Sequence, residues 1–295
     1  MQPPQTTLEP ALKVLTTGLG ASLQDLGRPG FGRFGVPRSG AMDAHAATWA
    51  NRLLDNPPHA ATLELLLQGA SLLALKTCWI SVCGADQSCS LPTWKTVRLE
   101  RGSVVEFPRN RTGLWTYLAI EGGFADPENA HFGSVSGDQA AGLGTRILPD
   151  QDLRHHAAHA LRLPTGVAAR MAPWDERRDY RYPPRLRAWK GPQWDRFSCA
   201  EQERFFSNPW MVSSRSDRTG YRIQGGPQET SAALTLSEAV IPGSVQVPPD
   251  GQPIITMNDG PTVGGYPKIA LLHPDDLAWL AQSRPGLAVR FELLA

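Results

Sequence analysis

Residues 244 to 268 hold the densest group of side chains and glycines that could do chemistry. The stretch reads SVQVPPDGQPIITMNDGPTVGGYPK, with Gly264 and Gly265 followed by Tyr266 and Lys268. Backbone N–H groups of adjacent glycines can hold an oxyanion, and a nearby lysine adds a fixed positive charge. The sequence therefore predicts a loop that binds a small anionic group. The alternative is a tight hairpin whose glycines only meet the needs of turn geometry.

Three further polar side chains of this stretch belong to the same candidate site. Asp259 precedes the glycine pair and could act as a base or orient a reacting group, while Gln246 and Thr262 could contact a ligand. The predicted catalytic residues are Asp259, Tyr266 and Lys268, and the predicted substrate-binding residues of the stretch are Gln246, Thr262, Gly264 and Gly265.

A second cluster, SSRSDRTGYRIQG at residues 213 to 225, combines three arginines with a tyrosine and a glycine. Arg218 or Arg222 could form a bidentate clamp on a carboxylate. A solvated run of charge at a strand edge is the alternative. We include Arg218 and Tyr221 among the predicted substrate-binding residues.

A third cluster lies in the glycine-rich stretch QDLGRPGFGRFGVPRSGAMD at residues 24 to 43. Asp25, Arg28 and Asp43 are predicted to bind substrate, although Asp25 and Arg28 could simply pin the loop. The stretch also contains GFGRFG, which matches the G-x-G-x-x-G pattern of dinucleotide-binding loops. That pattern requires a helix at the third glycine, whereas Pro37 disfavours helical angles in the residue before it. We therefore reject a dinucleotide site.

Composition excludes several classes of function. The 29 basic and 28 acidic residues among 295 give a formal charge of +1, which provides no field for a nucleic acid. No apolar run approaches the length of a membrane span, so we expect a cytoplasmic protein without membrane contact. The sequence has no phosphate-binding G-x-x-x-x-G-K-[ST] loop, no Met-Lys dipeptide for biotin and no zinc-ligand spacing. We expect no metal site, and another chain to handle ATP or biotin.

The elements that must position these residues are mostly short strands. The 28 Gly and 26 Pro residues favour strands joined by tight turns over a helical protein. Apolar runs separated by turn residues predict a barrel or sandwich, without the strand and helix alternation of a parallel sheet. The predicted strands of the first half include TLELLL (62 to 67), SLLAL (71 to 75), WISVC (79 to 83), VRL (97 to 99), VVEF (104 to 107) and WTYLAI (115 to 120).

Only short helices interrupt this pattern. Apolar residues between Met42 and Leu54 recur at three- and four-residue spacings and predict one helix, with Ser39 or Gly40 as its cap and Asp43 near its positive end. Near the end of the chain, Pro274 suits the first turn of another short helix.

An arginine- and histidine-rich segment at about 150 to 200 separates two predicted β-rich domains. The first covers residues 12 to 155 and carries the glycine-rich loop and one helix, and the second covers residues 156 to 295 and carries the GGYPK loop. Four cysteines at positions 78, 83, 89 and 199 show no pairing pattern, so we expect buried free thiols.

Several long motifs occur in order between Leu12 and Phe291. They are QDLGRPGFGRFGVPRSGAMD, TLE (62 to 64), YLAIEGGF (117 to 124), FGSVS (132 to 136), SDRTGYRIQG, VQVPPDGQPI and GGYPKIA. On these motifs the chain resembles the carboxyltransferase-like family that includes the C subunit of 5-oxoprolinase, also called the KipA or allophanate hydrolase subunit 2-like family.

The resemblance implies a mainly β fold of two cyclophilin-like β-barrel domains with a few short helices. It implies a hydrolase subunit that opens 5-oxo-L-proline to L-glutamate together with two companions, which resemble the B subunit (KipI) and the A subunit of 5-oxoprolinase. ATP would be bound by a partner or shared with one. For this ring opening we assign roles from residue chemistry. Gly264 and Gly265 would hold the oxyanion, and Lys268 and Arg218 would neutralise anionic groups. Gln246 and Tyr266 would orient the ring, and Asp259 would assist proton transfer.

Two other functions remain open within this resemblance. Relatives in urea carboxylase imply transfer of a carboxyl group from biotin, carried on another chain, to a urea-like or amide nitrogen. A non-catalytic regulatory or scaffold subunit is the other possibility. Many family members have Arg-Gln-Thr where this chain reads Gly260-Pro261-Thr262, which removes two side chains from the loop and suggests an altered substrate preference.

Overall fold

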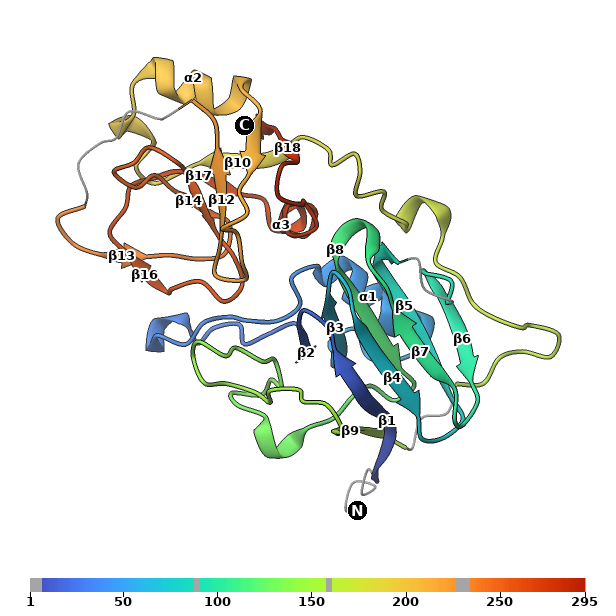
Figure 1. Ribbon diagram of the computed structural model, residues 1–295. Coiled ribbons are helices and arrows are strands. Elements are labelled where there is room, and N and C mark those ends of the chain that lie inside the picture. The colour runs from blue at the N-terminus through green and yellow to red at the C-terminus, as the bar shows by residue number, and fades with distance from the viewer. Residues whose placement is uncertain (1–6, 88–90, 158–160, 227–233, 295) are drawn as a thin grey trace. The chain divides into compact units, whose positions relative to one another are not determined.

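The computed structural model describes residues 7–87, 91–157, 161–226 and 234–294, and the chain divides into two units (Figure 1). The N-terminal unit comprises Met1–Gly27 and Asp43–Asp179, and the C-terminal unit comprises Arg28–Met42 and Tyr180–Ala295. The glycine-rich segment Arg28–Met42 therefore belongs with residues that follow it by about 140 positions in the sequence.

The division between the units differs from the predicted boundary between residues 155 and 156. Strand β9 (Asp152–His156) pairs antiparallel with β1 (Leu8–Thr17) and so completes a sheet of the N-terminal unit, which continues to Asp179. Charged side chains occur on strand edges as readily as in linkers, and for this reason the polar composition of the segment did not mark the end of the unit.

Nine strands of the described N-terminal unit form two antiparallel sheets. One sheet has the order β7-β4-β1-β9 and the other the order β2-β3-β8-β5-β6. Besides β1 and β9, the strands are β2 (Ala21–Gln24), β3 (Thr62–Leu66), β4 (Ala70–Ala74), β5 (Cys78–Gln87), β6 (Lys95–Leu99), β7 (Val104–Phe107) and β8 (Asn110–Ile120).

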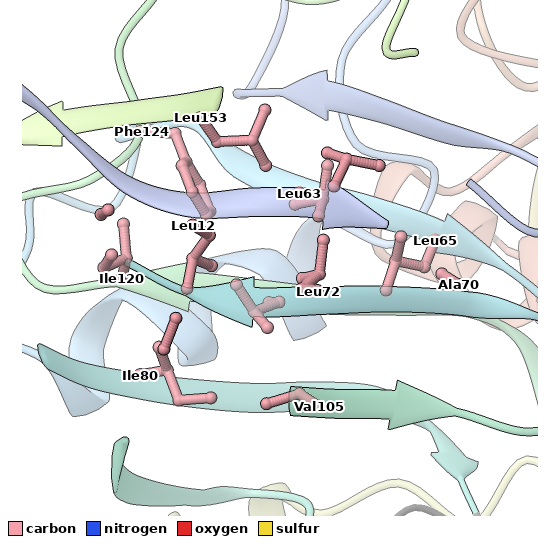
Figure 2. Close-up of a cluster of buried hydrophobic side chains, with 14 of the residues drawn as sticks. Leu12, Leu63, Leu65, Ala70, Leu72, Ile80, Val105, Ile120, Phe124 and Leu153 are labelled. Atoms are coloured by element: carbon pink, nitrogen blue, oxygen red, sulfur yellow. The ribbon is translucent and has the colours of Figure 1, made fainter. Parts of the chain in front are cut away.

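Both sheets contribute to one hydrophobic core, shown in Figure 2. Leu12 and Leu72 enter it from the first sheet, while Leu63, Ile80 and Ile120 enter it from the second. All five side chains are at most 1% exposed. Burial of an aliphatic side chain of this size contributes about 1.5–3 kcal/mol each, so this shared core stabilises the pairing of the two sheets.

Helix α1 (Ala44–Leu53) is the α-helix among the described residues of the N-terminal unit and packs on β5 and β8. Asp43 caps it by accepting a hydrogen bond from the Ala46 N–H at 3.0 Å. The predicted caps were Ser39 and Gly40, and this prediction was wrong. Ser39 has a φ of 54° and donates its N–H elsewhere, to the carbonyl of Asn258.

Eight strands of the described C-terminal unit form a sheet in the order β18-β11-β12-β15-β14-β17-β10-β19. Its two edge strands are separated in sequence by Arg290 alone, so the sheet nearly closes into a barrel. The strands are β10 (Leu186–Lys190), β11 (Trp210–Val212), β12 (Gly220–Gln224), β14 (Ser244–Gln246), β15 (Ile254–Thr256), β17 (Lys268–Leu272), β18 (Ala288–Val289) and β19 (Phe291–Leu293).

A two-stranded ladder and two α-helices complete the described C-terminal unit. Strand β13 (Glu238–Ala239) pairs with β16 (Val263–Gly264). Helix α2 (Cys199–Ser207) begins with a capping box, and α3 (Pro274–Ala281) begins at the predicted proline. Short 3-10 turns lie at Gly32–Phe34, Pro127–Asn129, Trp174–Glu176 and Trp194–Arg196.

The prediction of a mainly β fold with a few short helices is confirmed. Within the described ranges, no helix has both the length and the apolar character to cross a membrane. The thiols of Cys78 and Cys83 are free and buried as predicted, whereas Cys199 is exposed at the start of α2. Cys89 lies outside the described residues.

Candidate functional site

A cavity of about 640 Å³ lies on the C-terminal barrel, over β12, β14 and β15 and beside β16. Three of its lining residues form one cross-strand row, in which Arg222 is paired with Ile254 and Ile254 with Gln246. Gly220 and Thr256 form the next row. Residues opposite each other in a sheet share one face, so the cavity is built on a single face of the barrel.

Gln246 is held in a fixed orientation within this cavity. The side chain is 6% exposed, and its Nε2 donates a hydrogen bond to Thr256 Oγ1 at 3.0 Å. A Cβ atom on Gly264 would lie 2.6 Å from Gln246 Oε1 and 3.0 Å from a methyl group of Val240. The amide oxygen therefore packs against the bare Cα of Gly264, and a side chain at that position would displace it.

The predicted glycine loop is partly a strand. Gly264 is paired with Glu238 in the ladder of β13 and β16, and the carbonyl of Gly265 accepts a hydrogen bond from the Leu234 N–H at 2.8 Å. Both glycines and Tyr266 line the cavity, and Tyr266 is 40% exposed. Gly264 therefore lies in a ladder with a strand 26 residues earlier and not at the turn of a tight hairpin, and both glycines line the cavity.

Lys268 is buried beside the cavity and forms an ion pair. Its Nζ donates to Glu238 Oε2 at 3.0 Å, and Gln193 Nε2 donates to the same oxygen at 2.9 Å. These hydrogen bonds, that of Lys268 foremost, lower the pKa of the Glu238 carboxyl. Lys268 does not line the cavity, and its positive charge is paired with the carboxylate of Glu238.

Arg218 and Asp259 form a bidentate ion pair away from the cavity lining. Arg218 Nε lies 2.6 Å from Asp259 Oδ2, and Nη2 lies 2.9 Å from Oδ1. The same Nη2 donates to the carbonyl of Gly40 at 2.8 Å, and Asn258 Nδ2 donates to the carbonyl of Ala41 at 2.8 Å. The pair thus fastens the glycine-rich segment within the C-terminal unit. The predicted roles of these residues toward substrate stay predictions.

Two other predicted binding residues lie outside the cavity lining. Tyr221 is 2% exposed and its hydroxyl donates to the carbonyl of Ala281 at 2.6 Å. Thr262 accepts a hydrogen bond from the Val240 N–H through its carbonyl at 2.9 Å.

Asp25 holds together two loops of the N-terminal unit. Its Oδ1 accepts hydrogen bonds from the Gly27 N–H at 2.7 Å and from the hydroxyls of Ser134 and Ser136, each at 2.6 Å. Its Oδ2 accepts one from the Val135 N–H at 3.0 Å. The motif FGSVS is therefore a structural partner of Asp25.

Asp43 belongs to a buried network of the N-terminal unit. Its N–H donates to the Tyr117 hydroxyl at 2.7 Å, and that hydroxyl donates to Glu64 Oε2 at 2.7 Å. Burial, together with the charges of Glu64 and Asp43, raises the pKa of Tyr117. Arg28 is 1% exposed and belongs to the segment grouped with the other unit.

The cavity thus brings together four predicted residues, Gln246, Gly264, Gly265 and Tyr266. Its lining also includes polar and charged residues outside the predicted site, namely Arg215, Asp217, Thr219 and Thr256, together with Arg222, which the sequence offered as the alternative to Arg218. One signal for Arg222 was present in the sequence GYRIQ, where alternation places Tyr221 and Ile223 on one face and Arg222 on the other.

Comparison with known proteins agrees with this architecture. The chain is 35% identical over 290 residues to the C subunit of 5-oxoprolinase from Escherichia coli, covering 95% of this chain and 90% of that protein. It is 36% identical over 286 residues to the C subunit of 5-oxoprolinase from Haemophilus influenzae, covering 93% of this chain and 88% of that protein. The crystal structure of Kluyveromyces lactis urea carboxylase superposes with a TM-score of 0.85 and 26% identity, over 97% of this chain and 28% of that one.

The family model for the carboxyltransferase domain, subdomains A and B, matches residues 34–293. This range includes every strand of the C-terminal barrel and most strands of the N-terminal unit. The chain is similar to 5-oxoprolinase C subunits along nearly its whole length. By the match of its family model, the chain belongs to the carboxyltransferase-domain family.

Proposed function

We propose that the chain is one subunit of an ATP-dependent 5-oxoprolinase, which opens 5-oxo-L-proline to L-glutamate. The support is the similarity to proteins named as the C subunit of 5-oxoprolinase, which extends over about nine tenths of each partner. Such a protein works with companions, which we take to be an A-type and a B-type (KipI-like) 5-oxoprolinase protein.

The observation that carries the proposal is the cavity around Gln246. A lactam presents one N–H donor and one carbonyl acceptor, and the lining residues Gln246 and Gly265 carry an amide side chain and a backbone N–H that could match them. Tyr266 supplies a hydroxyl at the rim. The hydrogen bond to Thr256 already fixes the Gln246 side chain. Its amide could therefore orient the lactam ring without losing further conformational entropy on binding.

Hydrolysis of an unactivated amide requires an electrophilic carbonyl carbon and stabilisation of negative charge on its oxygen. Overall, the lactam, ATP and two waters give glutamate, ADP and phosphate. ATP supplies the phosphoryl group that would activate the lactam oxygen. The cavity has two arginines and one aspartate, a net side-chain charge of +1, which suits a monoanion better than a triphosphate. We therefore assign ATP binding to a companion protein or to a surface shared with one.

Carboxyl transfer from biotin is a second candidate function. It is favoured by the fold similarity to urea carboxylase. In this reaction too, an amide-like nitrogen would lie in the cavity, and biotin would arrive on another chain.

Reconstitution separates the two functions. The chain is mixed with its A-type and B-type companions from the same source, 5-oxo-L-proline and ATP, and glutamate and ADP are measured. We expect equimolar glutamate and ADP from the complete mixture and none when this chain is omitted. A parallel mixture contains urea, bicarbonate, ATP, a biotin carboxylase and a biotinylated carrier.

Failure of the complete mixture to release glutamate would refute the oxoprolinase proposal. Carboxylation of urea in the parallel mixture would then establish the second function. Glutamate formation that does not require this chain would also refute the proposal.

A further inference from the structure

The alternation of β12 separates its arginine from its aromatic and aliphatic residues. Tyr221 and Ile223 are 2% and 0% exposed and face the barrel core. Gly220 and Arg222 lie on the opposite face and line the cavity. Arg222 therefore lies on the cavity side of β12, next to Ile254 in the cross-strand row.

Arg222 differs from the neighbouring Arg218 in what it contacts. Arg218 is committed to Asp259 and to the carbonyl of Gly40. Among the described residues, no side-chain hydrogen bond or ion pair is formed by Arg222 or by Arg215, the other cavity arginine. The main chain of Arg222 is fixed, because its N–H donates to Ser216 Oγ at 3.1 Å.

The single carboxylate of the lining does not neutralise both arginines. Asp217 Oδ1 accepts hydrogen bonds from the N–H groups of Thr219 at 2.8 Å and Gly220 at 3.1 Å. Two arginines and one aspartate leave a net charge of +1. The charge balance of the cavity thus matches one carboxylate.

The distance between Arg222 and Gln246 also fits a small ligand. They lie on β12 and β14 with β15 between them, so their main chains are about 10 Å apart. Both residues line the cavity, and Ile254 lies between them in the cross-strand row. A five-membered lactam with a carboxylate on its ring has a polar group at each end and an apolar middle.

We propose that Arg222 binds the carboxylate of the substrate and that Arg215 adds a second positive charge at the exposed rim. This assignment rests on the proposed function in taking a carboxylate-bearing lactam as the ligand. Arg222 sets specificity for the acid end of the ligand, and Gln246 contacts its amide end. A guanidinium is suited to this role because two of its N–H groups can bind both oxygens of a carboxylate.

Calorimetric titration of the full chain tests the assignment. The probes are 5-oxo-L-proline, L-proline, 2-pyrrolidinone, which lacks the carboxylate, and inorganic phosphate. The wild-type chain is expected to bind 5-oxo-L-proline more tightly than 2-pyrrolidinone by about tenfold or more, because hydrogen bonds to a charged carboxylate are stronger than those between neutral groups.

The variants are Arg222→Met, Arg222→Lys and Arg215→Met, with Arg185→Met as a control at an exposed arginine of the same unit outside the cavity lining. Arg222→Met should lower affinity for 5-oxo-L-proline to that for 2-pyrrolidinone, without changing the latter. Arg222→Lys should restore part of the loss, Arg215→Met should have a smaller effect, and Arg185→Met should have none. Melting temperatures confirm that each variant is folded.

The outcomes distinguish this inference from the proposed function. Unchanged binding of 5-oxo-L-proline by folded Arg222→Met would overturn the clamp and leave the oxoprolinase function intact. If the chain bound L-proline in an Arg222-dependent way but did not bind 5-oxo-L-proline, the role of Arg222 in binding a carboxylate would stand. The same result would count against the proposed oxoprolinase function. Tighter binding of phosphate than of either carboxylate, or no binding of any carboxylate by the wild-type chain, would overturn the clamp.

Discussion

Arg218 holds both carboxylate oxygens of Asp259, with Nε–Oδ2 and Nη2–Oδ1 distances of 2.6 Å and 2.9 Å. The Asp259 side chain is 8% exposed and the Arg218 side chain 19%. Because Arg218 also binds the carbonyl of Gly40, the pair joins the turn after β15 to the glycine-rich segment. An arginine and an aspartate, residue types that are common in active sites, thus stabilise the contact between two segments of the C-terminal unit.

Asp259→Ala should destabilise the C-terminal unit by about 2–3 kcal/mol. Removing one partner of a fully buried ion pair costs about 3–5 kcal/mol, and the partial exposure of Arg218 reduces this cost. Urea unfolding followed by tryptophan fluorescence measures the change. Asp195→Ala is the control, because Asp195 is an exposed aspartate of the same unit. Equal stability of Asp259→Ala and the control would contradict the bracing role.

Gly264→Ala should perturb the cavity, whereas Gly265→Ala should be tolerated. A Cβ on Gly264 would lie 2.6 Å from Gln246 Oε1, but the closest atom to a Cβ on Gly265 is 3.8 Å away. We expect a loss of about 1–3 kcal/mol of stability for the first variant and little for the second, by thermal unfolding. Both substitutions keep the backbone N–H, so a difference between them reports packing. Gln246→Ala should rescue part of the loss in Gly264→Ala, and failure of that rescue would argue against the contact.

The ion pair of Glu238 and Lys268 should make stability depend on pH. The pKa of Glu238 is lowered from its ordinary value of 4.5 in the folded state, first by the hydrogen bond from Lys268 and then by that from Gln193. Its contribution is therefore complete above about pH 4.5 and is lost as pH falls through the lower folded pKa. Glu238→Gln should be less stable than wild type at neutral pH, and the difference should shrink at acidic pH. A difference that stays constant between neutral and acidic pH would show that the carboxylate charge contributes nothing.

Cysteine alkylation should distinguish the buried thiols of Cys78 and Cys83 from the exposed thiol of Cys199. Burial, with a further contribution from Glu121, raises the pKa of Cys78 to about 12, and burial raises that of Cys83 well above its ordinary value. Iodoacetamide at mildly alkaline pH should therefore label Cys199 in the native chain and reach Cys78 and Cys83 only in denaturant. Peptide mass mapping measures the labelling, and rapid modification of Cys78 in the native chain would contradict its burial.

Much of the fold was predictable because it depends on local patterns. Alternating apolar runs predicted strands that the structure confirms, among them β3 and β7, and Pro274 predicted the start of α3. The cap of α1 was misplaced by several residues, because Ser39 has the right side chain for a cap but lies in a segment bound to Asn258. That contact joins residues far apart in the chain, and no local pattern encodes it.

The candidate site was predictable only as a region. The loop containing Gly264 and Tyr266 does line a cavity, but Lys268 faces Glu238, a partner that no motif connects to it. The choice between Arg218 and Arg222 could not be made from the sequence for a related reason. Arg218 and Arg222 are equivalent as residue types, and only the strand register and the ion pair with Asp259 show which of them faces the cavity.

The positions of Gly260 and Pro261 also have a structural setting. A Cβ on Gly260 would lie 2.3 Å from a methyl group of Thr256 and 2.8 Å from the carbonyl of Thr219, so this backbone accepts no larger residue without moving. Pro261 lines the cavity. The local packing is therefore adapted to glycine at this position.

The central claim is that the cavity of this chain is the lactam site of a 5-oxoprolinase. Its most direct test is kcat/KM for 5-oxo-L-proline of the complex with the A-type and B-type companions, compared between Gly264→Ala and Gly265→Ala. We predict at least a tenfold loss for Gly264→Ala, equivalent to about 1.4 kcal/mol, and activity within about twofold of wild type for Gly265→Ala. Full activity of a folded complex containing Gly264→Ala would contradict the claim.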